Sequence, residues 1–287
     1  MKPTLVFIAL LLAITAFSGN AQKQTFLKWE LGYSKSASET PSKWVPATVP
    51  GAVQLDIAKA DKYEPFYYAE HWKDYLWMED QFYTYRTKFD APEKATGESV
   101  FFVSKGIDYE FKVFLNGAEI WHQEGMFTPV NLNLSDKLKS TNELKVLVYP
   151  VPKKHPLPAD RSQAANVAKP AVSYGWDWHP RLVPLGIWDE TYLEIRQASH
   201  VDDFHVNYAL NKDFSEAEID LQISGQNLKT QAFRWTLQDK EGKEVLRSEG
   251  KTQLTLTKPK LWWTHDHGEP YLYTSTLQLL NDQGQAF

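Results

Sequence analysis

The sequence contains no cysteine. Disulfide bonds, thiolate zinc sites and cysteine nucleophiles are therefore excluded. It also lacks a glycine-rich phosphate loop and a Gly-x-Ser-x-Gly turn, so neither of these two catalytic or nucleotide-binding motifs is available. A fold without disulfides depends on its hydrophobic core. With 287 residues, of which 43% are hydrophobic, the chain can build such a core and is long enough for two domains.

An excess of basic residues is absent as well. Lys and Arg number 31 against 36 Asp and Glu, which gives a formal net charge of −5. Because no basic stripe stands out, we do not expect a nucleic-acid partner. The segment His265-Asp266-His267 offers two histidines with no third ligand in view, and a polar turn explains it better than a metal site. We therefore predict neither a metal nor a cofactor.

Long apolar runs are absent except at the N-terminus. There, Lys2 precedes a run over residues 5–17 that only Thr15 interrupts, and small residues occupy positions 19–21. The run is shorter than the ~20 apolar residues that a membrane span needs. It is typical of a secretory signal peptide cleaved after Ala21. We expect residues 1–21 to be removed and the mature protein to be periplasmic or extracellular, with no membrane span.

Aromatic residues, in contrast, are abundant, with 11 Trp, 14 Tyr and 15 Phe. They favour strands and dominate core burial, and their flat faces also suit sugar rings. Side chains alternate with period two from Phe82 onward, and Asn116-Gly117 is a strong hairpin signal because both residue types accept a positive φ. The predicted strands are 82–89, 100–103, 109–115, 119–122, 127–134, 143–149 and 188–195. This pattern predicts an antiparallel jelly-roll sandwich over residues 22–196, with short helices or turns at 52–60 and 70–77.

The alternation begins again near Gln197. Predicted strands follow at 200–210, 217–224, 233–238, 245–249, 253–256 and 271–280, which favours an immunoglobulin-like sandwich over residues 197–287. We expect this sandwich to be incomplete, because the turn at 281–284 has no partner strand after it. Between the last two strands of the first domain, the proline-rich segment 150–184 has little periodicity. Its apolar and aromatic residues indicate an ordered loop.

Five ordered motifs resemble glycoside hydrolase family 2, and its β-mannosidase branch in particular. They are residues 43–51 (KWVPATVPG), 61–68 (DKYEPFYY), 111–117 (FKVFLNG), 175–180 (GWDWHP), and 262–263 (WW) with 268–273 (GEPYLY). The resemblance covers nearly all of residues 29–280. It implies a galactose-binding-like sandwich and an immunoglobulin-like domain that precede a (β/α)8 barrel.

In that family the barrel carries both catalytic glutamates, at the ends of its strands. The resemblance therefore implies that this chain is truncated before the barrel and holds no catalytic residue, so that it is inactive alone. The chain does contain Asn142-Glu143, the dipeptide that marks the acid/base of the family. Here it opens an alternating strand, and we interpret it as structural.

The resemblance also implies a substrate site in the loop at 175–180. There Asp177 would accept hydrogen bonds from hydroxyls of a terminal sugar, and Trp176 and Trp178 would form walls of the site. The residues alone leave another interpretation open, in which Asp177 caps a turn and the tryptophans attach the loop to the sandwich. Two departures from the family, Ala168 in place of Arg and His179 in place of Gly, put mannose specificity in doubt.

Three functions are consistent with the sequence. The first is the non-catalytic N-terminal part of a retaining β-mannosidase-like hydrolase, whose partners are a β-mannoside or related β-glycoside and the missing C-terminal barrel. The second is a stand-alone carbohydrate-binding protein without catalysis. The third is a purely structural sandwich.

Overall fold

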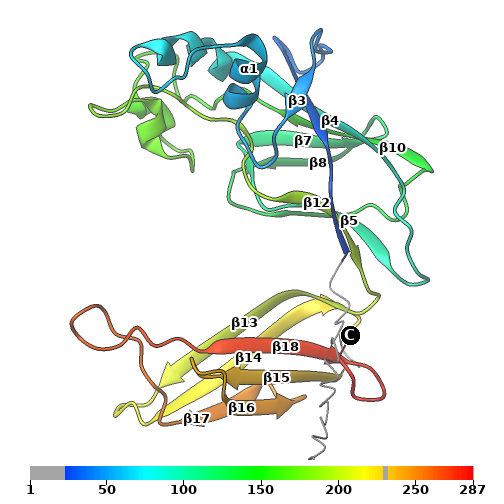
Figure 1. Cartoon of the computed structure of the whole chain (residues 1–287), viewed down its shortest axis with the longest axis vertical. Helices are drawn as coiled ribbons and strands as arrows, with labels where there is room; N and C mark the ends of the chain where they lie inside the picture. The colour runs from blue at the N-terminus through cyan, green and yellow to red at the C-terminus, as the bar shows by residue number, and fades with distance from the viewer. Residues whose placement is uncertain (1–22, 229–231, 287) are drawn as a thin grey trace, which may run out of the picture. The chain divides into compact units, whose positions relative to one another are not determined.

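The structure, a computed structural model, describes residues 23–228 and 232–286. The predicted signal peptide at residues 1–21 therefore lies outside the described residues. The chain forms two compact units, with the boundary between Ala198 and Ser199 (Figure 1).

The larger unit has two principal sheets. The first has six strands in the order β3 (Val45–Ala47), β2 (Trp29–Ser34), β4 (Phe82–Asp90), β10 (Thr141–Val148), β7 (Glu110–Leu115) and β8 (Ala118–Glu124). The second has four strands in the order β1 (Lys23–Phe26), β12 (Thr191–Arg196), β5 (Ser99–Ser104) and β9 (Val130–Asn133). A short ladder joins β6 (Ile107–Asp108) to β11 (Gly186–Ile187).

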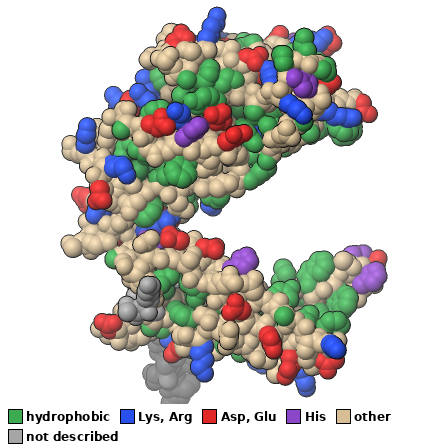
Figure 2. All heavy atoms as spheres, turned by 180° about the vertical axis from the view of Figure 1, so that it is seen from behind, with side chains coloured by type: hydrophobic (Ala, Val, Ile, Leu, Met, Phe, Trp, Pro, Cys, Tyr) green, Lys and Arg blue, Asp and Glu red, His purple; other side chains and the backbone are tan. Residues whose placement is uncertain are grey.

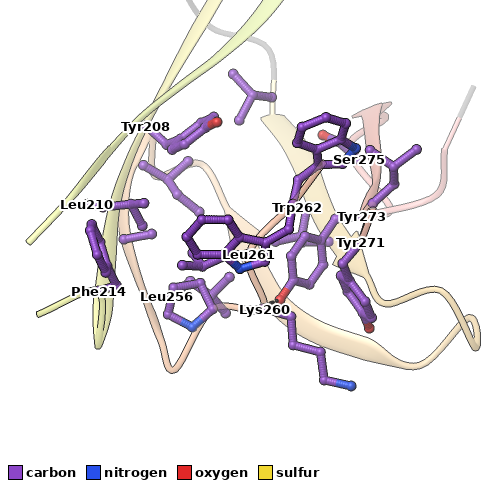
Figure 3. Close-up of a pocket in the computed structure, with 17 residues that line it drawn as sticks. Tyr208, Leu210, Phe214, Leu256, Lys260, Leu261, Trp262, Tyr271, Tyr273 and Ser275 are labelled. Atoms are coloured by element: carbon purple, nitrogen blue, oxygen red, sulfur yellow. Dashed lines mark hydrogen bonds between the residues drawn. The ribbon is translucent and has the colours of Figure 1, made fainter. Parts of the chain in front are cut away.

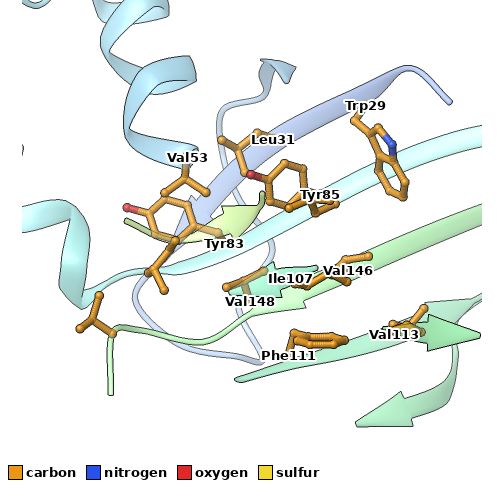
Figure 4. Close-up of a cluster of buried hydrophobic side chains, with 14 of the residues drawn as sticks. Trp29, Leu31, Val53, Tyr83, Tyr85, Ile107, Phe111, Val113, Val146 and Val148 are labelled. Carbon is orange, nitrogen blue, oxygen red and sulfur yellow. The ribbon is translucent and has the colours of Figure 1, made fainter. Parts of the chain in front are cut away.

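Period-two alternation explains how these strands form a core. In β4, Tyr83 and Tyr85 are two residues apart, so both point to the same face, and both are fully buried. They pack in one cluster with Phe111 and Val113 of β7 (Figure 4). Phe102 of the second sheet belongs to the same cluster. Burial of each such ring stabilises the fold by about 2 kcal/mol. The two sheets therefore share one hydrophobic interior.

The predicted Asn116-Gly117 hairpin is confirmed. These two residues join β7 to β8 with φ angles of 52° and 86°, as a two-residue turn of this type requires. The Asn116 side chain also donates to the Asn142 side chain and accepts from the Glu143 backbone N–H. Asn142 and Glu143 thus anchor a turn from within β10, as their structural interpretation predicts.

Short helices cover one end of the sandwich. They are α1 (Val53–Asp61) and the 3-10 helices η1 (His71–Asp80), η2 (Arg161–Ala164) and η3 (Ala171–Tyr174). The backbone N–H of Val53 donates to Leu185, and that of Gly51 donates to Ile187. These bonds join the start of α1 to the end of the 150–184 segment, and so bring the two parts of the chain together.

The smaller unit is a sandwich of two three-stranded sheets. One has the order β13 (His200–Leu210), β14 (Glu216–Gln226) and β17 (Gln253–Thr257), and the other has β16 (Glu244–Glu249), β15 (Ala232–Gln238) and β18 (Thr274–Leu280). Its core contains Ile219, Leu221, Trp235 and Leu237. The Trp235 ring N–H donates to the Ser275 hydroxyl at 2.7 Å, which satisfies the one polar atom of that ring.

This sandwich contains an apolar pocket of about 540 Å³. In Figure 3, Tyr208, Leu210 and Phe214 lie on one side of it and Tyr271 and Tyr273 on the other. Figure 2 shows hydrophobic side chains gathered at this end of the unit, close to histidines. The only charged side chain in the lining is that of Lys260. The pocket therefore lacks the pair of carboxyl groups that glycoside cleavage requires.

Several predicted boundaries were wrong. The strand expected at 188–195 is β12, which begins only at Thr191. Residues 188–190 are not in a strand, because the Trp188 ring packs on Gly106 and its N–H donates to the Met126 carbonyl. The strand expected at 271–280 begins only at Thr274. The strand expected at 127–134 is limited to β9, and strands β1, β2 and β3 were not predicted. In these places tertiary contacts interrupt or extend the local pattern.

The fold class is confirmed. All strand pairs in residues 23–228 and 232–286 are antiparallel, so this part of the chain holds no (β/α)8 barrel. No helix in these ranges is long and apolar enough to cross a bilayer.

Candidate functional site

The segment 150–184 has no strand, yet a buried ion pair fixes its middle. The Lys169 ammonium contacts both carboxylate oxygens of Asp108, and the two side chains are 0% and 3% exposed. Lys169 also donates to the Pro184 carbonyl at 2.9 Å. Burial raises the pKa of Asp108 and lowers the pKa of Lys169, while the charge of each partner opposes that shift. The segment is thereby attached to β6, 61 residues earlier in the chain.

A second ion pair fixes the end of the segment. The Arg181 guanidinium makes a forked contact with the Glu79 carboxylate, at 3.0 Å from each of two nitrogens, and also donates to the Tyr174 carbonyl. Lys153 lies 2.6 Å from the same carboxylate. Tyr174 is fully buried and its hydroxyl donates to the Pro152 carbonyl. The two ends of the segment therefore meet at one acidic residue of η1.

These contacts leave a short tip, residues 176–178, exposed to solvent. Gly175 has a φ of 114°, which favours glycine, and directs the chain outward. The Trp176 backbone N–H donates to the His179 carbonyl at 2.9 Å and closes a tight turn. The rings of Trp176 and Trp178 lie 5.1 Å apart, and they are 38% and 71% exposed. Both rings are thus available at the surface of the unit.

Asp177 separates the two tryptophans in the sequence, and its side chain is exposed. Its carboxylate makes no hydrogen bond or ion pair with any residue that the structure describes. It therefore does not cap the turn, although a turn is present. An exposed, unpaired carboxylate can accept hydrogen bonds from two hydroxyl groups of one ligand. The roles of Asp177, Trp176 and Trp178 in substrate binding remain predictions.

The arrangement distinguishes two arginines that could replace the one absent at Ala168. Arg181 is bound to Glu79 and is 10% exposed, so its donors are already occupied. Arg161 is exposed, and its guanidinium carbon lies 3.6 Å from the centre of the Trp176 ring. Arg161 makes no ion pair within the described ranges. Of these two arginines, Arg161 is the one with free donors beside the tip, and nothing in the sequence places residue 161 over residue 176.

The other sequence candidates lie elsewhere. Asn142 is 1% exposed, and its side chain is bonded to Asn116 and to the backbone of Lys139. His265 is 3.1 Å from Asp266 in an exposed turn. Across residues 23–228 and 232–286, no group of three or more His, Asp or Glu side chains is arranged to hold a metal. The tip at 176–178 is therefore the candidate that combines free polar groups with exposed rings.

Comparison with known proteins supports the resemblance in both units. Residues 29–189 match the family described as "Glycosyl hydrolase 2 galactose-binding domain-like", and residues 199–287 match "Glycosyl hydrolases family 2". β-Mannosidase B of Emericella nidulans is 28% identical over 280 residues, which cover 88% of this chain and 33% of that protein. The β-mannosidase B of Aspergillus clavatus is 27% identical and is covered to the same extent.

Solved structures agree. The crystal structure of β-D-mannosidase from Dictyoglomus thermophilum has a TM-score of 0.77 and 28% identity, over 93% of this chain and 35% of that one. An FMN-binding β-glucuronidase from Facaelibacterium prausnitzii L2-6 shares the fold, with a TM-score of 0.64 and 18% identity over 93% of this chain and 38% of that one. This chain spans about a third of the length of the curated relatives that it matches. From these matches, the chain belongs to glycoside hydrolase family 2, to whose N-terminal sugar-binding-like and immunoglobulin-like domains its two units correspond.

Proposed function

We propose that this chain is the N-terminal, non-catalytic part of a retaining β-mannosidase-like hydrolase that acts on terminal β-linked sugars of glycans or polysaccharides. The tip at 176–178 contributes to the substrate site, and a catalytic barrel elsewhere in the whole protein supplies the two glutamates. The names of the relatives support the reaction class. The observation that carries the proposal is the free, exposed Asp177 carboxylate, with an exposed tryptophan before and after it in the sequence, on a segment fixed by ion pairs to Asp108 and Glu79.

The test is Asp177→Ala in the intact gene product. Loss of two hydrogen bonds to a charged group should lower kcat/KM for an aryl β-mannoside about 100-fold. The unfolding midpoint should not change, because Asp177 has no partner in the described part of the fold. Asp136→Ala is the matched control, since Asp136 is another exposed loop aspartate. A rate equal to that of the unmodified protein would remove Asp177 from the site.

The alternative is carbohydrate binding without catalysis, and the exposure of Trp178 favours it, since 71% of a large ring is open to solvent. The same experiment separates the two functions. If the intact gene product binds β-mannosides but hydrolyses none of the β-glycosides tested, binding alone is the function.

We also propose that the protein is exported. Residues 1–21 have the composition of a signal peptide. N-terminal sequencing of the protein purified from its native host should begin at Gln22. A mature protein that still begins at Met1 would contradict export by this route.

A further inference from the structure

An aromatic recess of about 630 Å³ lies beside the candidate tip. Three parts of the chain line it: the start of α1, residues 66–75, and residues 179–184. His179 belongs to both features, because it lines the recess and its carbonyl accepts the bond that closes the Trp176 turn. The recess and the tip are therefore connected by one tight turn.

The recess has no charged side chain in its lining. Its rings come from Phe66, Tyr67, Trp72 and Tyr75, and the Tyr67 side chain is 79% exposed. Without Lys, Arg, Asp or Glu, this lining offers nothing to neutralise a phosphate or a charged peptide. It fits a neutral ligand that has an apolar face.

Three side chains of the lining also have unused hydrogen-bonding atoms. The Tyr67 hydroxyl and the Trp72 ring N–H make no hydrogen bond within the described ranges. His179 donates from Nδ1 to the Pro180 carbonyl, so Nε2 of the neutral ring is left as an acceptor. By contrast, the Tyr75 hydroxyl donates to the backbone carbonyl of Glu64, and the Gln54 amide donates to the backbone carbonyl of Val183. Two kinds of donor and one acceptor thus surround an aromatic surface.

We propose that this recess binds a second pyranose unit of a β-linked oligosaccharide, next to the terminal sugar at Asp177. A sugar ring has apolar C–H faces that pack on aromatic rings and hydroxyls that bond at its edge, which matches both properties of the lining. The position of this subsite rests on the proposed function, because the terminal sugar defines its neighbour. The recess distinguishes oligosaccharides from monosaccharides, and His179 contributes to that preference.

The test is calorimetric titration of the chain with β-1,4-mannotriose and with mannose. We expect Tyr67→Ala and Trp72→Ala each to weaken mannotriose binding about tenfold, with mannose affinity unchanged. His179→Ala should weaken it about fivefold through loss of one acceptor. Trp121→Ala is the control, because Trp121 is 41% exposed on β8 and lies outside the recess lining. Tyr67 is mostly exposed, so its variant keeps the test valid if Trp72→Ala does not fold.

Two results would overturn the proposal: no detectable binding of mannotriose, or equal affinity in the unmodified chain and all recess variants. The outcome is distinct from that of the hydrolysis test. An intact gene product that cleaves β-mannosides, with a mannotriose affinity insensitive to Tyr67 and Trp72, rejects the recess alone. A gene product without hydrolase activity rejects the proposed reaction and leaves a measured mannotriose preference in place.

Discussion

At the scale of single residues, Arg161 and Arg181 show how the same side chain can have two tasks. Arg181 donates from two guanidinium nitrogens, Nε and Nη2, to the two oxygens of the Glu79 carboxylate, and it holds the segment 150–184 in place. Arg161 stacks on Trp176 and keeps its donors free. An exposed cation–π contact contributes about 0.5–1 kcal/mol, whereas loss of one partner of a buried pair costs about 3–5 kcal/mol. Arg161 should therefore matter for ligand binding and Arg181 for folding.

Arg161→Ala should lower kcat/KM of the intact gene product about threefold to tenfold, because Trp176 loses its stacking partner and the site loses its donors. Chemical unfolding should show a change below about 1 kcal/mol. Arg161→Lys keeps the charge without the planar fork and should recover part of the activity.

Arg181→Ala provides the contrast, with a loss of about 3 kcal/mol or more in unfolding free energy. If Arg161→Ala and Arg181→Ala lower kcat/KM and the unfolding free energy to the same extents, the separate roles assigned to the two arginines are wrong.

At the scale of elements, the segment 150–184 depends on the Asp108–Lys169 pair. Breaking a buried pair leaves one charge without compensation, whereas removing both partners does not. Lys169→Met should therefore lower the unfolding free energy by about 3–5 kcal/mol, and Asp108→Asn combined with Lys169→Met should recover much of this loss. Urea titration of the three proteins measures both values. Equal instability of the single and double variants would contradict the pair as the cause.

The pair also predicts a pH dependence. Burial raises the pKa of Asp108 in the folded chain above its ordinary value of 3.8. The folded state therefore loses stability as the pH rises from that ordinary value through the raised pKa. Lys169→Met removes the charge that opposes this shift, so the pKa of Asp108 rises further and the loss of stability extends to higher pH. The stability difference between Lys169→Met and the unmodified chain should therefore be larger at pH 7 than near pH 4. A difference that is constant over this range would count against an ionised Asp108.

At the scale of the whole molecule, the two units have separate hydrophobic clusters. A smaller domain buries a smaller fraction of its surface, so the unit after Ser199 should unfold first. We expect two transitions in urea. Leu221→Ala should lower the unfolding free energy of the first transition by about 2–5 kcal/mol, and Leu144→Ala should lower that of the second by a similar amount. A single transition that both variants shift equally would show that the units unfold together.

Local signals were sufficient for much of this architecture. Alternation around Tyr83 and Tyr85 depends only on the pleat of a strand, and the turn at Asn116-Gly117 depends only on the φ angles that these residues accept. The helix or turn expected at 52–60 corresponds to α1, a helix of nine residues, because a short helix is also formed by contacts between near neighbours in the sequence. The same reasoning missed β1 and the break at Trp188, where the deciding contacts come from distant residues.

The sequence by itself determined the all-β class, the two sandwiches, the family and the motif at 175–180, because each is written in neighbouring residues. Only the tertiary structure decided which arginine stacks on Trp176, that Asp177 is free, and that an aromatic recess adjoins His179. The physical reason is separation along the chain. Lys169 meets Asp108 across 61 residues and Arg181 meets Glu79 across 102, and contacts at such distances exist only after the strands between them have packed.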